Sequence, residues 1–175
     1  NPGKVTYSSN GIGGTQHLAV ELLAARTGIK LVHVPYKDGA QSTSDMVAGV
    51  IDMLFGGSLL LPHAKTGKVH IVAVGHMKRA GATPDVPTMH EQGITGFDMG
   101  SWYGFVVPGR TPRPAIDALH TAVMKVMNAP KLRETFLEQH GALLRLMNPE
   151  EFGAFIAAEI PRLGRSARLS GAQPD

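Results

Sequence analysis

Cysteine is absent from the 175 residues of this sequence. Disulfide bonds, thiol catalysis and cysteine-based zinc sites are therefore excluded together, and the redox compartment is left open. Aromatic residues are also scarce, at 6% of the chain, with a single tryptophan. The longest apolar runs, 53–61 and 71–74, are broken by glycine or fall far short of the roughly 20 residues that a membrane helix needs. We therefore expect no direct insertion into a membrane.

Charge of one sign is not in large excess, because 17 basic residues stand against 14 acidic ones for a formal net charge of +3. The basic residues are scattered and form no stripe interleaved with aromatic side chains, so no nucleic-acid partner is predicted. A mildly positive chain still suits the attraction of small anions. The sequence opens without a signal peptide, directly before a strand-like segment, which we interpret as a processed or truncated start.

The first part of the chain alternates short apolar segments with helical patterns. Strands are expected at 5–8, 31–34, 51–55 and 71–74, and helices at 15–26 and 40–48, with a shorter helix at 59–65. Gly28 follows the first of these helices, as is typical of a helix C-terminus. Helices of this length between strands favour right-handed βαβ units and a mainly parallel sheet.

The rest of the chain has a different organisation. A loop rich in Gly and Pro with one helical turn at 88–92 is expected over 77–100, a strand at 101–107, and a short strand at 143–146. Helices are expected to begin at Pro112 and Pro130, and a third follows Asn148, which resembles a capping box. Pro161 is expected to kink or end that last helix.

The change near residue 100 predicts two lobes. The later helices carry apolar stripes that cannot cover one another without a second sheet, and the sequence supplies none. These stripes consist of Ile116, Leu119, Val123, Leu132, Phe136, Phe152, Phe155 and Ile156. We therefore expect residues 101–175 to be poorly ordered, to oligomerise, or to pack on a segment outside this sequence.

A glycine-rich turn between the first strand and the first helix is the strongest candidate for a binding site. Backbone N–H groups and the positive end of a helix dipole converge there, and glycines allow an anion to approach closely. Candidate ligand contacts are Ser8, Ser9, Gly11, Gly13 and Thr15, and His17 in the first helical turn either touches the anion or packs. The turn matches neither a P-loop nor a full dinucleotide fingerprint, and a tight turn without a ligand remains an alternative.

Two further loops end on the same edge of the expected sheet. Tyr36 follows the second strand, and Gly57 and Ser58 follow the third. Open parallel sheets bind ligands at the carboxyl ends of their strands, so these loops are expected to complete one site. None of the eight histidines forms a helical metal-binding pair with a carboxylate between, and there is no Gly-x-Ser-x-Gly elbow. We predict no metal, no cofactor and no catalysis, although a small hydrolase that uses the serine-rich turn stays open.

Several strings of the sequence, taken in order, resemble one family. They are YSSNGIG at 7–13, HVPYK at 33–37, PDVPT at 84–88 and SWYG at 101–104. The chain resembles the Bug-type (TctC-like) substrate-binding proteins of tripartite tricarboxylate transporters over nearly its whole length.

The resemblance implies an α/β, periplasmic-binding-protein-like (type II, Venus flytrap) fold with one lobe complete and the other partial. Residues 1–100 would be the second lobe, and residues 101–175 the returning C-terminal part of the first lobe. It also implies a non-enzymatic periplasmic protein that captures a small carboxylate, such as a di- or tricarboxylate, an amino acid or an aromatic acid. Its partners would be that carboxylate and the membrane components of the transporter. By resemblance, the ligand contacts fall on Ser9, Gly11, Gly13 and Thr15, with Tyr36 and the turn at 57–58 beside them.

Three other interpretations compete with this one. The effector domain of a transcription regulator shares the two-lobe design, but it would need an upstream helix-turn-helix, of which the sequence shows no trace. A hydrolase would turn over an ester. A degenerate fragment would bind nothing.

Overall fold

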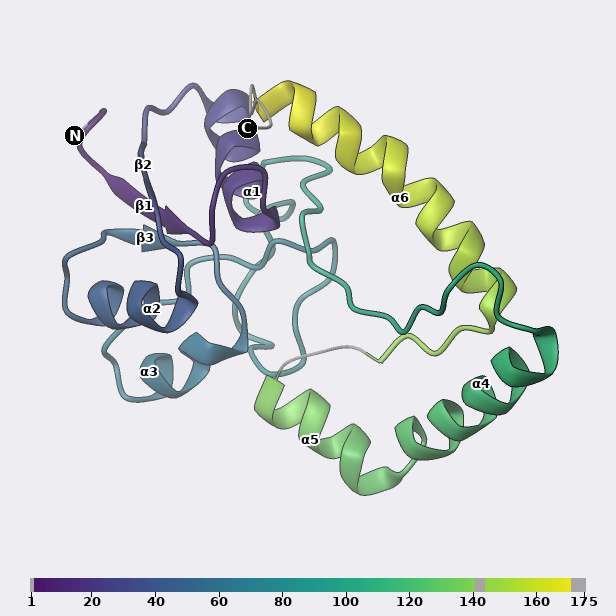
Figure 1. The fold of residues 1–175 in the computed structure, drawn as a ribbon. Helices are drawn as coiled ribbons and strands as arrows, with labels where there is room; N and C mark the ends of the chain where they lie inside the picture. Colours follow the sequence, from purple (N-terminus) through teal and green to yellow (C-terminus); the bar gives the residue numbers. More distant parts are fainter. Residues whose placement is uncertain (1, 141–143, 171–175) are drawn as a thin grey trace.

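The computed structural model describes residues 2–140 and 144–170. A parallel sheet with the strand order β2-β1-β3 lies near its N-terminus (Figure 1). The strands are β1 (Thr6–Ser9), β2 (Val32–Pro35) and β3 (Met53–Leu54). In the register of the sheet, Tyr7 of β1 pairs with His33 on one side and with Met53 on the other. The prediction of a parallel sheet built from strand–helix units is confirmed.

The helices of this part begin and end close to where the sequence predicts. They are α1 (Thr15–Thr27), α2 (Gly39–Val47) and α3 (Leu61–Lys65), the last preceded by the short 3-10 helix η1 (Ser58–Leu60). Gly28 ends α1 in the left-handed region at φ 72°, and its N–H bonds the Ala24 carbonyl. Asp38 caps α2 by accepting the Ala40 N–H at 2.9 Å.

Two predicted strands are absent from the described part of the chain. Residues 71–74 form no strand, and Val74 makes only an isolated parallel bridge to Thr88. Val72 is 72% exposed, so this short apolar run bonds the following loop instead of extending the sheet. Residues 101–107 also form no strand and are exposed throughout. A strand needs a partner along its length as well as suitable residues; within the described residues the first run pairs only at Val74, and the second run pairs nowhere.

The loop at 77–100 makes the single turn that the sequence predicts and also part of the core. Thr88 and Glu91 form reciprocal hydrogen bonds. The Thr88 N–H donates to Glu91 Oε2 at 2.7 Å, and the Glu91 N–H donates to Thr88 Oγ1 at 3.0 Å. The same loop buries Phe97 and Met99 completely. They join Leu18, Ala19 and Leu22 of α1 in the hydrophobic core.

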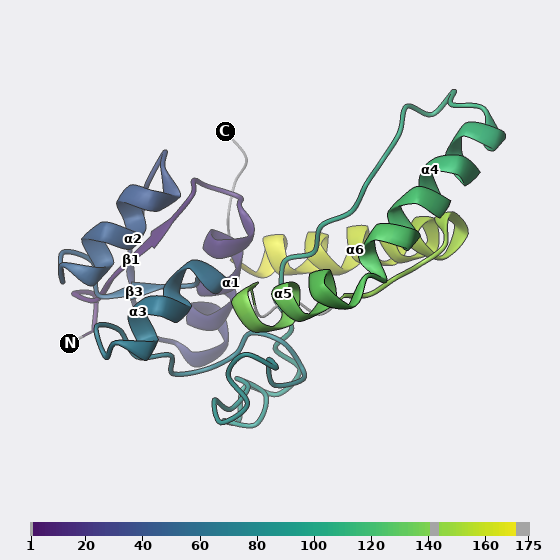
Figure 2. The same ribbon diagram turned by 90° about the horizontal axis from the view of Figure 1, so that it is seen from below.

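The C-terminal part consists of α4 (Arg113–Met127), α5 (Pro130–His140) and α6 (Pro149–Ser170). Helix α4 lies far from the sheet, whereas α6 runs back and packs against α1 (Figures 1 and 2). The expected capping box is present, because the Asn148 N–H bonds Glu151 and the Glu151 N–H bonds Asn148 Oδ1 at 2.8 Å. Of the short strand expected at 143–146, residues 144–146 form none, and residue 143 lies outside the described residues.

Helix α6 was expected to kink or end at Pro161; it does not end there but continues to Ser170. Proline removes one backbone donor from the helix. Packing beyond it compensates, because Leu163 and Ala167 lie against the core that α1 forms. Within the described residues, no helix is both long and apolar enough to span a membrane.

Candidate functional site

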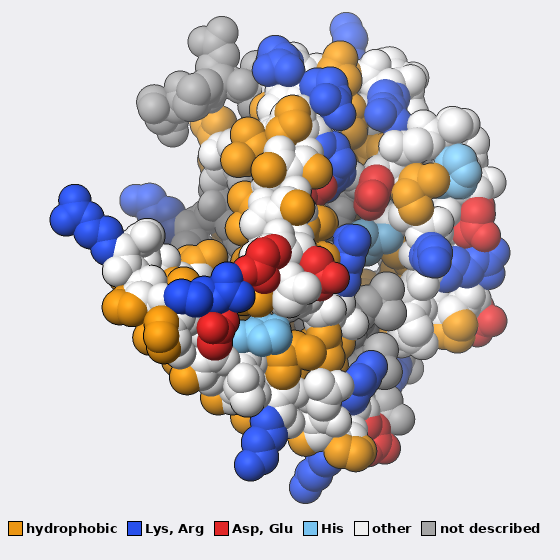
Figure 3. Space-filling view, turned by 90° about the vertical axis from the view of Figure 1, so that its right-hand side faces the viewer, with side chains coloured by type: hydrophobic (Ala, Val, Ile, Leu, Met, Phe, Trp, Pro, Cys, Tyr) orange, Lys and Arg blue, Asp and Glu red, His pale blue; other side chains and the backbone are white. Residues whose placement is uncertain are grey.

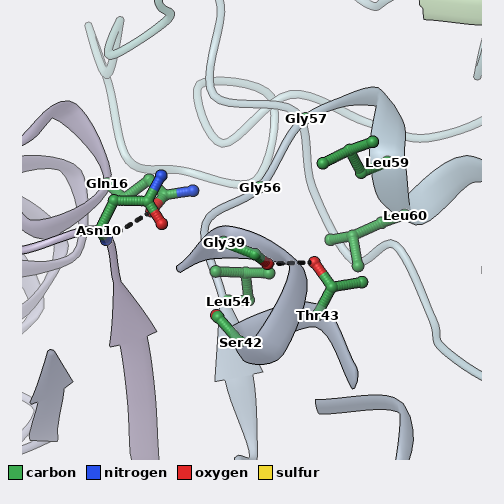
Figure 4. A pocket seen from close by; sticks show the side chains of 10 residues that line it. All are labelled: Asn10, Gln16, Gly39, Ser42, Thr43, Leu54, Gly56, Gly57, Leu59 and Leu60. Carbon is green, nitrogen blue, oxygen red and sulfur yellow. Dashed lines mark hydrogen bonds between the residues drawn. The ribbon is translucent and has the colours of Figure 1, made fainter. Parts of the chain in front are cut away.

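The carboxyl ends of the parallel strands place three loops side by side, as the sequence predicts. The loops follow β1 at Asn10, β2 at Tyr36 and β3 at Phe55. A pocket lies at this edge (Figure 4) and holds about 320 Å³ of space, open solvent at its mouth included. It is lined by Asn10, Gln16, Gly39, Ser42, Thr43, Leu54, Gly56, Gly57, Leu59 and Leu60. Most of that space is open to solvent, so the enclosed part of the pocket is far smaller than a complete small-molecule site.

Neutral polar groups from two helices line part of this pocket. The Asn10 N–H donates to Gln16 Oε1 at 2.9 Å, which fixes the side chain of Gln16 at the first turn of α1. Gly39 begins α2 close to Asn10, because a Cβ at Gly39 would lie 3.3 Å from Asn10 Oδ1. The first-turn N–H groups of both helices favour an anion, although the carboxylate of Asp38 already takes one of those of α2.

The predicted glycine turn is present, but its N–H groups serve the turn itself. Gly11 and Gly13 have φ values of 114° and 79°, which favour glycine over every other residue. The Gly11 N–H donates to Ser9 Oγ at 3.2 Å, and the Gly13 N–H donates to His17 Nδ1 at 3.2 Å. Ser9 and His17 therefore hold the turn together.

A buried cluster of polar rings lies beneath the turn. Ser9 Oγ is 2.7 Å from His33 Nε2, and the His33 ring lies 4.4 Å from the ring of His17 and 4.8 Å from that of Tyr7. Burial lowers the pKa of His33, and the neighbouring His17 lowers it further. Burial and the hydrogen bond to Glu21 raise the pKa of the Tyr7 hydroxyl. Both shifts favour the neutral forms of His33 and Tyr7.

The other candidate residues lie at different depths around the pocket. Ser8 is fully buried, and its Oγ accepts from Ser42 Oγ at 2.8 Å. The Tyr36 hydroxyl donates to Asp45 Oδ2 at 2.7 Å, and this bond raises its pKa. Thr15 is the half-buried first residue of α1. Contact of these residues with a ligand stays a prediction.

Gly57 is the candidate residue that lines the pocket directly. Ser58 begins η1, and its side chain lies outside the described part of the structure. Sequence reasoning missed Gln16 and Thr43, which carry no motif. Asn10 and Gly39 were within its reach, because each lies in one of the loop segments that it singled out, although neither was named as a ligand contact.

Ser9 and His33 have the spacing of a nucleophile and its base, which bears on the hydrolase interpretation. The side chain of Ser9 is 0% exposed, however, and its hydroxyl also contacts the Gly11 carbonyl at 3.1 Å. A nucleophile must reach the substrate, so this geometry does not favour hydrolysis. Among the residues that the structure describes, no group of three or more His, Asp or Glu side chains is arranged to hold a metal ion.

Comparison with known proteins identifies the family. Residues 1–170 match the family described as the tripartite tricarboxylate transporter family receptor (TctC). The chain belongs to this receptor family. It is 34% identical over 164 residues to a UPF0065 protein of Pseudomonas sp. strain P51, covering 93% of this chain and 48% of that relative.

Solved structures give the same answer for the fold. The periplasmic binding protein BugD is 29% identical with a TM-score of 0.89, and the match covers 100% of this chain and 59% of BugD. An R. palustris protein solved with adipate is 28% identical with a TM-score of 0.84, covering 100% of this chain and 58% of that one. The chain therefore has the α/β fold of periplasmic binding proteins, and it spans about half the length of the Pseudomonas relative.

Proposed function

We propose that this protein is the solute-binding component of a tripartite tricarboxylate-type uptake system and captures a small carboxylate without turning it over. The pocket where three loops and two helix N-termini meet, in a chain that belongs to a receptor family, carries this proposal. The adipate in the related R. palustris structure supports the ligand class. Anions at helix N-termini gain from N–H donors and from the helix dipole.

The proposed organisation has two lobes. Residues 1–100 form one lobe with the sheet and the pocket, and residues 101–175 contribute to another. Within the described residues, α4 has no buried side chain, with Leu119 and Val126 more than half exposed. Figure 3, which shows one face of the molecule, has hydrophobic side chains exposed between charged ones. An apolar stripe without cover supports a lobe that is completed by further structure.

The proposed location is the periplasm, where such a receptor would deliver its ligand to the membrane components of the transporter. The relation to a periplasmic binding protein supports the location, and family membership supports the partners. The proposed ligand contacts are the pocket residues Asn10, Gln16 and Gly57, together with Thr15 and Tyr36 of the sequence prediction.

A pair of glycine substitutions tests carboxylate binding at this pocket. A Cβ at Gly57 or at Gly81 would meet no atom within 4 Å, so both positions accept a side chain. Gly57→Val places two methyl groups at the pocket, and we expect it to weaken carboxylate binding in NMR titrations of the ¹⁵N-labelled chain. Gly81→Val is the matched control. Equal binding by both variants, or no binding of any carboxylate by the unmodified chain, would contradict the proposal.

A further inference from the structure

The pocket has two chemically different sides (Figure 4). Asn10 and Gln16 lie on one side, Leu59 and Leu60 lie opposite them, and Leu54 with residues of α2 forms the base. All ten lining residues are described, and none of them carries a charged side chain. A ligand therefore meets neutral hydrogen-bonding groups at one end and hydrocarbon at the other.

The donors are concentrated on the side of Asn10 and Gln16. Because Gln16 Oε1 is fixed as the acceptor of the Asn10 N–H, the NH₂ group of Gln16 remains a donor. Thr43 at the base uses its hydroxyl hydrogen on the Gly39 carbonyl at 2.9 Å, so its oxygen is left to accept. Ser42 donates to Ser8 and is buried. A carboxylate, which only accepts hydrogen bonds, is matched by the Asn10–Gln16 side.

Among the side chains that the structure describes, none on the opposite side is polar. Leu59 is 71% exposed at the pocket, whereas Leu60 beside it is 9% exposed. Gly56 lies against Leu60 and Leu54, since a Cβ there would stand 2.6 Å from Leu60 Cδ1 and 3.3 Å from Leu54 Cδ2. A polar side chain at position 56 would therefore displace Leu60 and Leu54. Covering the exposed Leu59 side chain with an apolar part of the ligand removes both surfaces from water, which favours binding.

We propose that the ligand is a carboxylate with an unhydroxylated alkyl or aryl body, bound by its carboxylate at Asn10 and Gln16 and covered by Leu59. This inference rests on the proposed function and narrows it. Each ligand methylene group that is buried against the leucines increases the affinity about fourfold. A hydroxyl covered by these leucine side chains gives up its water without gaining a hydrogen bond from them, which costs about tenfold in affinity.

A series of acids with one carbon frame tests the body of the ligand. Succinate, malate and tartrate share a four-carbon diacid frame and differ only in hydroxyl groups, and adipate lengthens the apolar part. We expect affinity to rise from tartrate through malate to succinate by about tenfold a step, and to rise again for adipate. Equal affinities, or the reverse order, overturn the inference and leave carboxylate binding intact. If none of these acids shifts the amide signals of Gly56 and Gly57, the proposed function fails as well.

A substitution at the exposed leucine assigns the effect to this wall. Leu59→Asn keeps the size of the side chain and removes its apolar character, and Leu119→Asn on α4 is the matched control at another exposed leucine. We expect Leu59→Asn to weaken succinate and adipate binding about tenfold and to leave tartrate binding unchanged or stronger, whereas Leu119→Asn changes none of the three. If the two variants behave alike toward every acid, Leu59 does not cover the ligand and the inference is wrong.

Discussion

Replacing Glu159 by glutamine tests the contact between α6 and the segment at 98–102. Glu159 is 8% exposed and accepts from Arg162 Nε and Nη2, both at 2.6 Å, and from Trp102 Nε1 at 3.1 Å. Arg162 also donates to the backbone oxygen of Asp98. The carboxylate and the guanidinium thus hold residues 98–102 against α6.

The expected loss at pH 7 is about 2 kcal/mol of unfolding free energy. Hydrogen bonds to charged groups contribute about 1.5–3 kcal/mol, and Glu159→Gln removes the charge while it keeps the shape. The lower half of that range applies, because the Arg162 side chain is 28% exposed and water screens the pair.

The stability difference between the wild type and Glu159→Gln should depend on pH in a definite direction. The hydrogen bonds from Arg162 lower the pKa of Glu159 below its usual 4.5. A carboxyl group with a lower pKa in the folded state stabilises it above the unfolded pKa, and this stability is lost as pH falls through the folded pKa. The difference between the wild type and Glu159→Gln should therefore be complete at pH 7 and narrow below about pH 4.5.

Urea unfolding followed by Trp102 fluorescence at pH 7 and pH 3 measures both quantities. Trp102 is the single tryptophan and packs edge-on against Phe152 and Phe155, so its emission reports the loss of this contact. Glu134→Gln on the exposed surface of α5 is the control for charge alone. A loss at pH 7 no larger than that of the control, or a difference just as large at pH 3, would refute the reasoning.

Three further outcomes are expected. Phe97→Ala should lower the unfolding free energy by about 3–5 kcal/mol in urea titrations, because it empties a fully buried site, whereas Phe105→Ala at a side chain that is 77% exposed should cost far less. Asn148→Ala should cost about 1 kcal/mol, because it removes the cap of α6. NMR titration should find the pKa of Asp52 below its usual 3.8, since the Thr6 N–H and hydroxyl bond its carboxylate, and Thr6→Val should raise that pKa.

Features that depend on neighbouring residues were predictable from the sequence. The start of α6 follows from Asn148 and Glu151, whose reciprocal bonds need only a spacing of three residues. The end of α1 follows from Gly28, the residue that most easily adopts the left-handed conformation found there. The meeting of three loops at one sheet edge follows from the alternation of strands and helices, because parallel strands end on the same side.

Features that depend on distant partners were not predictable. Phe97 and Met99 stand in a loop rich in glycine and proline, and nothing in their local pattern shows that α1 lies against them. The strand pattern of 101–107 is suitable for a sheet, but strand formation requires a partner that the described chain does not offer. Gly13 was expected to offer its N–H to a ligand, whereas His17 takes that donor. A single sequence gives the donors near a turn but not the bonds that already occupy them.

The exposed segment at 101–107 connects the lobe organisation with the strength of binding. Tyr103, Phe105 and Val106 are at least 77% exposed, although Trp102 beside them is anchored to Glu159. Covering such side chains would stabilise by roughly 1.5–3 kcal/mol each, which favours a second lobe packed there. On that organisation the pocket supplies one half of a closing site, so this chain alone should bind carboxylates with dissociation constants nearer millimolar than micromolar. Micromolar binding in the NMR titrations would show that one lobe is sufficient.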